Sequence, residues 1–172
     1  MKTSIITALL FFFLSISAQG HNHNTDNFSS EFTELIGKYL EFKDALVGSD
    51  AEAALSAASQ MQEQLEAIGE HRLEGDAHMK WMDHYSKIGT QLSAVTSDSD
   101  LEEIRARFYD LSETLIEGVK TLGIEGVVYQ QHCPMAFNNE GGSWLSSEDQ
   151  VMNPYMPDTM LRCGRVIERI ES

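Results

Sequence analysis

Four stretches of the chain carry apolar residues at the three- and four-residue spacing that is typical of amphipathic helices. These stripes span residues 32–46, 54–68, 78–95 and 101–122. The connections between them are short and polar, and short connections make neighbouring helices antiparallel. The pattern therefore predicts a mostly α-helical protein that folds as an up-down-up-down four-helix bundle.

Two polar pairs and one glycine mark the expected ends of these helices. Ser49 and Glu52 are three residues apart, as are Ser99 and Glu102, and this spacing is that of a capping box at a helix N-terminus. Gly123 follows the last apolar stripe and is expected to end the fourth helix. We also expect Trp81, Phe108 and Leu111 to be buried together, because each lies on the apolar stripe of its helix.

The helical pattern stops after Gly123, and the remaining residues 124–172 have a different character. Residues 127–129 are apolar or aromatic and are typical of a short strand. All three prolines and both cysteines lie in this part, together with a Gly-Gly pair, and such residues favour turns. We expect an irregular C-terminal cap that packs on the bundle, so that residues 29–172 form a single domain.

The N-terminal residues 1–20 have the pattern of a secretory signal peptide. Lys2 precedes an apolar run over residues 5–14, and small residues follow up to Ala18 and Gly20, which are the expected cleavage positions. A membrane anchor is the alternative, but the run is shorter than the ~20 apolar residues of a transmembrane helix. The polar residues 21–28 are then expected to form a flexible leader of a periplasmic protein.

The charge of the chain is strongly acidic, and this narrows the functions that it could have. Asp and Glu number 27 against 12 Lys and Arg, which gives a formal net charge of −15. Such a surface repels the phosphates of nucleic acids and of anionic lipids. The sequence also has no CxxC pair, nucleophile elbow, glycine-rich phosphate loop or paired-histidine zinc motif, so we expect no enzyme activity.

The predicted cap gathers the sulfur-containing side chains that could bind a metal ion. Cys133 and Met135 would share one face of an extended segment, and Met160 and Cys163 would share one face of a helical turn. Thiolate and thioether sulfurs are soft ligands that select Cu(I). The sequence therefore predicts a copper site formed by these four residues, whereas His132 would point away from Cys133.

A disulfide bond between the two cysteines is the competing prediction for the cap. Paired cysteines in an exported chain commonly form disulfides. In that case Cys133 and Cys163 would be bonded to each other and the methionines would be apolar core residues. The protein would then be an interaction module of the cell envelope that binds no metal.

Two further groups of residues are secondary candidates for metal ligands. His78 and Met82 are four residues apart and would share one face of the third helix, although a half-buried packing role for His78 is the alternative. After signal cleavage, either His21 or His23 would be the third residue of the mature chain. A histidine in that position can bind Cu(II) together with the free amine and backbone nitrogens.

The order of short motifs in the cap resembles that of domain-of-unknown-function family 3347, which occurs in exported proteins of Gram-negative bacteria. The shared motifs are CPMA at 133–136, a glycine-rich turn with WLS at 141–146, NPY at 153–155, and ML with CG at 160–164. The HMKWM segment at 78–82 is also similar. The resemblance covers residues 32–166.

This resemblance implies a helical bundle with a C-terminal cap. Related domains occur beside the periplasmic adaptor subunits of copper and heavy-metal efflux pumps, which implies a role in metal biology by analogy. We therefore expect a periplasmic protein that binds a soft metal ion, most simply Cu(I). It would buffer the ion or carry it to a heavy-metal efflux system. The family itself has no established activity.

Overall fold

A computed structural model describes residues 23–171 of the chain, and the predicted signal peptide at 1–20 lies outside them. The first helix, α1, spans His23–Val47. It begins inside the predicted flexible leader, so the described part of that leader is helical. The physical reason is Phe28, which is buried and makes an edge-to-face contact with Trp81 at 5.1 Å between ring centroids. Burial of this ring stabilises additional turns at the start of the helix.

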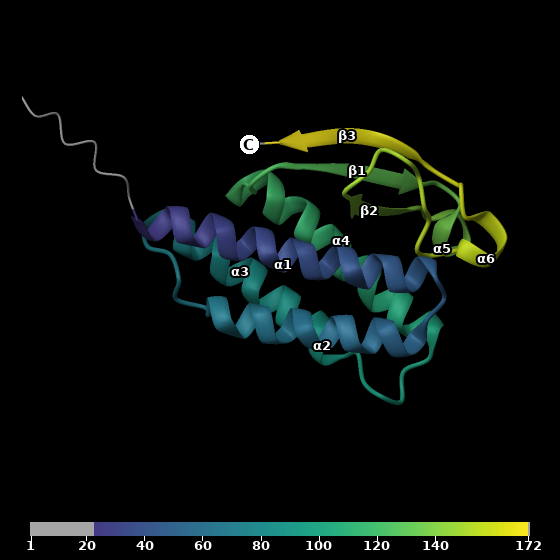
Figure 1. Ribbon diagram of the computed structural model, residues 1–172, viewed down its shortest axis with the longest axis horizontal. Helices are drawn as coiled ribbons and strands as arrows, with labels where there is room; N and C mark the ends of the chain where they lie inside the picture. Colours follow the sequence, from purple (N-terminus) through teal and green to yellow (C-terminus); the bar gives the residue numbers. More distant parts are fainter. Residues whose placement is uncertain (1–22, 172) are drawn as a thin grey trace, which may run out of the picture.

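The four predicted helices are present and pack in sequence. After α1 come α2 (Ala51–Ile68), α3 (Gly75–Ser93) and α4 (Leu101–Leu122), and α4 also contacts α1 (Figure 1). The predicted four-helix bundle is confirmed. None of the described helices combines the length and the apolar character that crossing a membrane requires.

The apolar stripes form one continuous core between the helices. Trp81, Phe108 and Leu111 are all buried in it, as expected. Their aromatic contacts lie at different levels along α1, because Trp81 packs against Phe32 whereas Phe108 packs against Phe42. The core is therefore continuous, but these three side chains do not form a single contact cluster of their own.

The helix caps differ by one residue from the sequence prediction. The N-cap of α4 is Asp100, whose carboxylate accepts a hydrogen bond from the Glu103 N–H at 2.9 Å in a complete capping box. Likewise Asp50, and not Ser49, caps α2. In both loops a serine is followed directly by an aspartate, and the aspartate takes the capping position. A carboxylate near a helix N-terminus also interacts favourably with the helix dipole.

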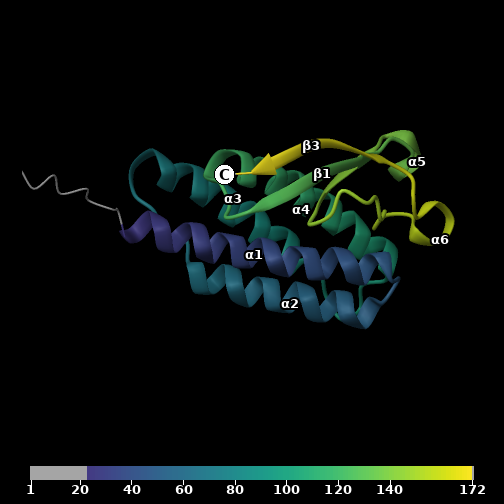
Figure 2. The ribbon, with the colours of Figure 1, turned by 45° about the horizontal axis from the view of Figure 1, so that its top comes forward.

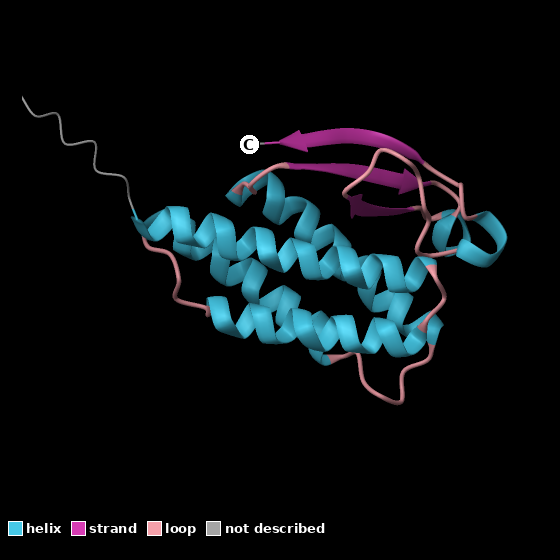
Figure 3. Cartoon of the chain, viewed as in Figure 1, coloured by secondary structure: helices cyan, strands magenta, loops and turns pink. Residues whose placement is uncertain are grey.

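The cap is more regular than the sequence suggested, because it contains a three-stranded antiparallel sheet in the order β2-β1-β3. Its strands are β1 (Val127–Cys133), β2 (Gly142–Ser146) and β3 (Arg165–Glu171). Figure 3 shows the sheet as a second layer on the helices, and Figure 2 shows the same arrangement from another angle. The short helices α5 (Ala136–Asn139) and α6 (Pro157–Met160) lie in the connections at one end of the sheet.

Polar contacts fix the cap to the helices, and two of them come from Tyr39 and Arg105. The central strand of the sheet is β1. The neighbouring strand β2 packs on α4 and α1, and all five of its residues are buried. The Tyr39 hydroxyl on α1 accepts a hydrogen bond from the backbone N–H of Leu145 at 3.1 Å. Arg105 on α4 donates to the carbonyl oxygens of Pro154 and Leu46, at 3.0 and 3.3 Å. The candidate site in the cap therefore rests on a well-anchored support.

Candidate functional site

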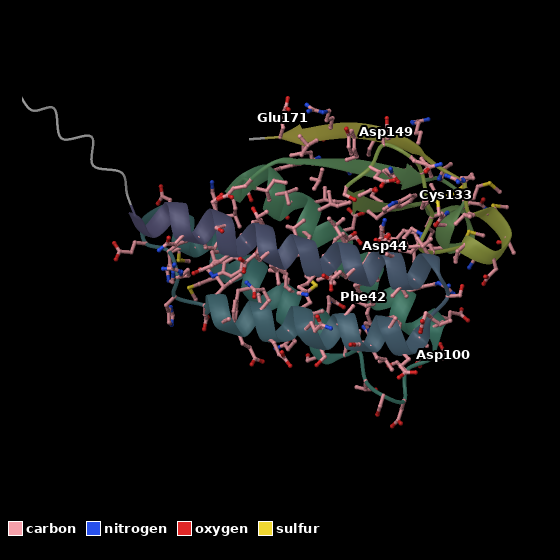
Figure 4. All side chains as sticks on the ribbon, in the orientation of Figure 1. Phe42, Asp44, Asp100, Cys133, Asp149 and Glu171 are labelled. Atoms are coloured by element: carbon pink, nitrogen blue, oxygen red, sulfur yellow. A yellow bond between two sulfur atoms is a disulfide. The ribbon has the colours of Figure 1, made fainter. Side chains whose placement is uncertain are left out.

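The two cysteines of the chain meet in the cap and are bonded to each other. Cys133 is the last residue of β1 and is fully buried, and Cys163 lies between α6 and β3. Their Cα atoms are 5.5 Å apart, a normal distance for a disulfide. Figure 4 shows the bonded sulfurs beside the label of Cys133. The prediction that these residues lie close together is confirmed, and in this oxidised state neither sulfur is a thiolate.

Met160 lies in the same turn as Cys163. The Cys163 N–H donates to the Met160 carbonyl oxygen at 2.9 Å, and the Met160 N–H donates to the Met156 carbonyl oxygen at 2.8 Å. This segment is the helical turn that the sequence predicted. It keeps Met160, which is half-buried, in the immediate neighbourhood of the disulfide.

Met135 does not share an extended segment with Cys133, contrary to the geometry that the sequence suggested. The strand β1 ends at Cys133, and Met135 has helical backbone angles of φ −97° and ψ −8°. Its side chain is 44% exposed and lines a groove of about 540 Å³. Met156, and not Met160, is the methionine that lines this groove with Met135. Phe137 and Tyr155 supply its aromatic wall.

The residues that follow Met135 have an unusual backbone conformation. Phe137, Asn138 and Asn139 have φ angles of 49°, 57° and 72°, so three consecutive non-glycine residues are left-handed. Such conformations carry strain and persist only where the surroundings hold them. Here the Phe137 ring packs against Tyr109 and Tyr155 at centroid distances of 4.8 and 5.0 Å. These contacts fix the turn that presents Met135 to the groove.

Two glycines of the cap motifs are required by close contacts. Gly164 has a φ of +132°, and a Cβ atom there would lie 2.8 Å from the carbonyl oxygen of His132. At Gly142, a Cβ atom would lie 2.9 Å from the Tyr155 ring. These glycines therefore allow β1, β2 and the disulfide segment to approach one another. The glycine positions of the sequence motifs are explained by packing.

The His132 ring makes a polar contact with the neighbouring strand β2. Its Nδ1 atom is 3.1 Å from the Ser143 hydroxyl oxygen, across the β1–β2 pair. Burial raises the pKa of the Glu113 carboxyl on α4, and the nearby His132 ring and Lys120 side chain partly oppose this shift. This polar cluster links α4 to the sheet.

The bundle provides a second cluster of possible ligands that the sequence only partly identified. His78 and Met82 lie one turn apart on α3, as predicted. The ring of His71, from the α2–α3 connection, lies 5.4 Å from the ring of His78. Sequence reasoning missed His71, because its only signal was its place in the loop that precedes α3. The leader candidate His21 lies outside the described residues, and His23 is the first residue of α1.

Clusters of conventional hard or borderline ligands are not found in the part of the chain that the structure describes. No group of three or more His, Cys, Asp and Glu side chains there could hold a metal ion.

Comparison with protein-family models identifies a matching family. The family described as "Protein of unknown function (DUF3347)" matches residues 35–126, which is more than half of the 172-residue chain. The match covers the helical bundle, whereas the disulfide and the methionines of the cap lie beyond it. Comparison with the curated proteins and with the solved structures found no match. On the extent of the family match, the chain belongs to the DUF3347 family.

Proposed function

We propose that this protein binds a soft metal ion, Cu(I), in its reduced form and buffers it or carries it to an efflux system of the cell envelope. The observation that supports this most is the meeting of Cys133 and Cys163 beside Met160. Two thiolates and a thioether are ligands that a polarizable d¹⁰ ion prefers. Met135, two residues from Cys133, is the proposed fourth ligand.

Metal binding at this site requires reduction of the disulfide. A dithiol reductant supplies two electrons and is itself oxidised to a disulfide, while the S–S bond breaks and two thiols form. Both thiols lose their protons when they bind the metal. Met135 must then turn its side chain from the groove toward Cys133. The redox state of the compartment would therefore control whether copper is held or released.

The test is a competition between the protein and a Cu(I) chelator, followed by native mass spectrometry. Reduced protein should take up one Cu(I), and oxidised protein should take up none at the cap. Cys133→Ser or Cys163→Ser should abolish tight binding, because each removes a charged ligand. If the reduced protein takes up no Cu(I) from the chelator, the proposal is wrong.

The role of the methionines is tested by substitutions that keep volume and apolarity nearly constant. The double variant Met135→Leu, Met160→Leu should fold normally but should lose preference for Cu(I) over Zn(II), because zinc does not need thioether ligands. Met61→Leu in the buried core of α2 is the matched control and should change nothing. Met156→Leu tests whether Met156, and not Met135, is the fourth ligand. If Met156→Leu lowers the preference for Cu(I) more than Met135→Leu does, the ligand role belongs to Met156.

The disulfide itself favours a second candidate function. With Cys133 and Cys163 bonded, the cap is a rigid support for the groove lined by Met135, Phe137 and Tyr155. A protein of this kind would be an interaction module that binds no metal. The same competition experiment decides between the two candidate functions. An interaction module of this kind should bind no Cu(I), whether the protein is reduced or oxidised.

A further inference from the structure

The two histidines beside the α2–α3 connection have the geometry of a shared ligand site. The ring centroids of His71 and His78 are 5.4 Å apart, and the rings are inclined by 33°. Imidazole nitrogens bind metals at about 2.0 Å, so two rings that bind one ion have centroids roughly 5–6 Å apart. The observed separation falls in that interval.

His78 also carries a buried polar atom that lacks a partner. Its Nδ1 atom is inaccessible to solvent and makes no hydrogen bond to any of the described residues. A buried nitrogen in this condition costs free energy, which a bound metal ion would recover. The contact between the two rings does not explain why this nitrogen is unpaired. The unpaired nitrogen is therefore an independent indication of a ligand.

The surroundings of the pair favour a cation. Glu70, Glu74 and Asp76 lie next to these histidines in the chain and are exposed, so they add negative potential. The nearest cation in the sequence is Arg72, whose guanidinium is held by the Glu31 carboxylate at 2.7 Å. That ion pair reduces the repulsion that Arg72 would exert on an incoming metal ion.

Met82 supplies a third possible ligand from the same helix. It lies one turn after His78 on α3 and is half-buried. Residues four apart on a helix share a face, so Met82 lies on the same face of α3 as His78. A weak thioether beside two imidazoles is a ligand set that suits copper, and Cu(II) binds nitrogen ligands most strongly among the divalent first-row ions.

We propose that His71 and His78, with Met82 as a weak third ligand, form a Cu(II) site at the end of the bundle. This site is separate from the cap. The α2–α3 connection lies at the opposite end of the bundle from α5 and α6 (Figure 1). It needs no thiolate, so it operates in the oxidised protein, in which the cysteines are bonded.

The experiment is a titration of the oxidised full chain with a Cu(II) salt, followed by electron paramagnetic resonance. His21→Ala and His23→Ala are introduced as a common background, so that the N-terminal histidines cannot bind the ion. The spectrum should show imidazole nitrogen coordination at one equivalent. Either His71→Ala or His78→Ala should weaken binding by about tenfold or more, and binding should weaken as the pH falls because protons compete for the imidazoles.

The matched control is His132→Gln in the same background, which removes a histidine from the cap and leaves the α2–α3 end unchanged. It should bind Cu(II) as tightly as the background protein. Thermal unfolding without metal verifies that each variant is folded. Unchanged affinity in both His71→Ala and His78→Ala would overturn the proposal, as would an equal loss in the control. Because the thiols are blocked throughout, failure here leaves the Cu(I) proposal for the cap standing.

Discussion

At the scale of single residues, one hydroxyl group joins the helices to the sheet. Tyr39 is fully buried, and its hydroxyl lies 2.8 Å from the Ser112 hydroxyl oxygen. Ser112 in turn donates to the Phe108 carbonyl oxygen at 2.7 Å, so the Tyr39 proton goes to Ser112. The Tyr39 oxygen is then free to accept from the Leu145 N–H. Burial raises the pKa of Tyr39, which keeps the hydroxyl protonated in this chain of hydrogen bonds.

Replacement of Tyr39 by phenylalanine should therefore destabilise the protein. The change leaves the ring in place but removes the hydroxyl that accepts from the Leu145 N–H, and a buried unpaired N–H costs about 1–3 kcal/mol. Urea unfolding monitored by circular dichroism measures the loss. Tyr85→Phe is the control, since its hydroxyl does not bridge helix and sheet, and it should change stability much less. A loss for Tyr39→Phe no larger than the control would contradict this account.

Sequence reasoning at this scale succeeded where local spacing decides the outcome. His78 and Met82 share a face because they lie four residues apart on one helix. It failed for Met135, because the strand ends at Cys133 and a strained turn redirects the chain. It also missed His71, whose partner is supplied by tertiary packing and not by periodicity.

At the scale of the elements, aspartate side chains cap the N-termini of α2 and α4. The Asp100 carboxylate accepts from the Glu103 N–H, and the Glu103 carboxylate accepts from the Asp100 N–H at 3.2 Å. Serine and aspartate both cap helices well, so the sequence alone did not distinguish Ser99 from Asp100. In the structure the Ser99 hydroxyl accepts a hydrogen bond from the Thr96 N–H at 3.2 Å, so it belongs to the preceding turn, and Asp100 is left to cap the helix.

Loss of this cap should weaken α4 measurably. Asp100→Ala removes the carboxylate and should cost about 0.5–2 kcal/mol of the free energy of unfolding. Asp100→Asn keeps an oxygen that can accept from the Glu103 N–H and should retain most of the stability. Thermal unfolding of both variants compares them directly. If Ser99→Ala proves as damaging as Asp100→Ala, the assignment of the cap is incorrect.

The sheet was harder to predict than the helices, for a physical reason. The apolar stripes of helices are local patterns, and the apolar residues that they marked are buried in the core or partly buried against it. The strand β1 continues through Gln130 and Gln131, two polar residues that sequence patterns do not assign to a core. Both are nevertheless buried, because Lys120 donates to the Gln130 amide oxygen and Gln131 donates to the Glu148 carbonyl oxygen. Such non-local partners cannot be identified from spacing.

At the scale of the whole molecule, the disulfide closes the cap around its own sequence. It joins residues that are 30 positions apart and encloses α5, β2 and α6. Cysteine count predicted that the two residues meet, but it left the choice between a disulfide and a metal open, because both require the same proximity. Chain geometry cannot make that choice, since it depends on the redox potential of the surroundings.

Reduction of the disulfide should lower the stability of the protein substantially. Closing a loop of this length restricts the unfolded chain, which is worth roughly 3–4 kcal/mol in the chain-entropy model. Urea unfolding with and without a thiol reductant, in the presence of a metal chelator, should show this difference. The Cys133→Ala, Cys163→Ala variant is the control and should not respond to reductant. Equal stability of the reduced and oxidised wild-type protein would show that packing alone holds the cap.

The strand β3 has one edge that pairs with β1, and the sheet order leaves its other edge without a neighbouring strand. An open edge can recruit a strand from another molecule, which is a common route to aggregation. Here the strand carries four charged side chains, at Arg165, Glu168, Arg169 and Glu171, and all four are exposed. Stacking two such edges would bring charges into a desolvated contact. The charges of β3 thus protect this edge of the sheet against uncontrolled self-assembly.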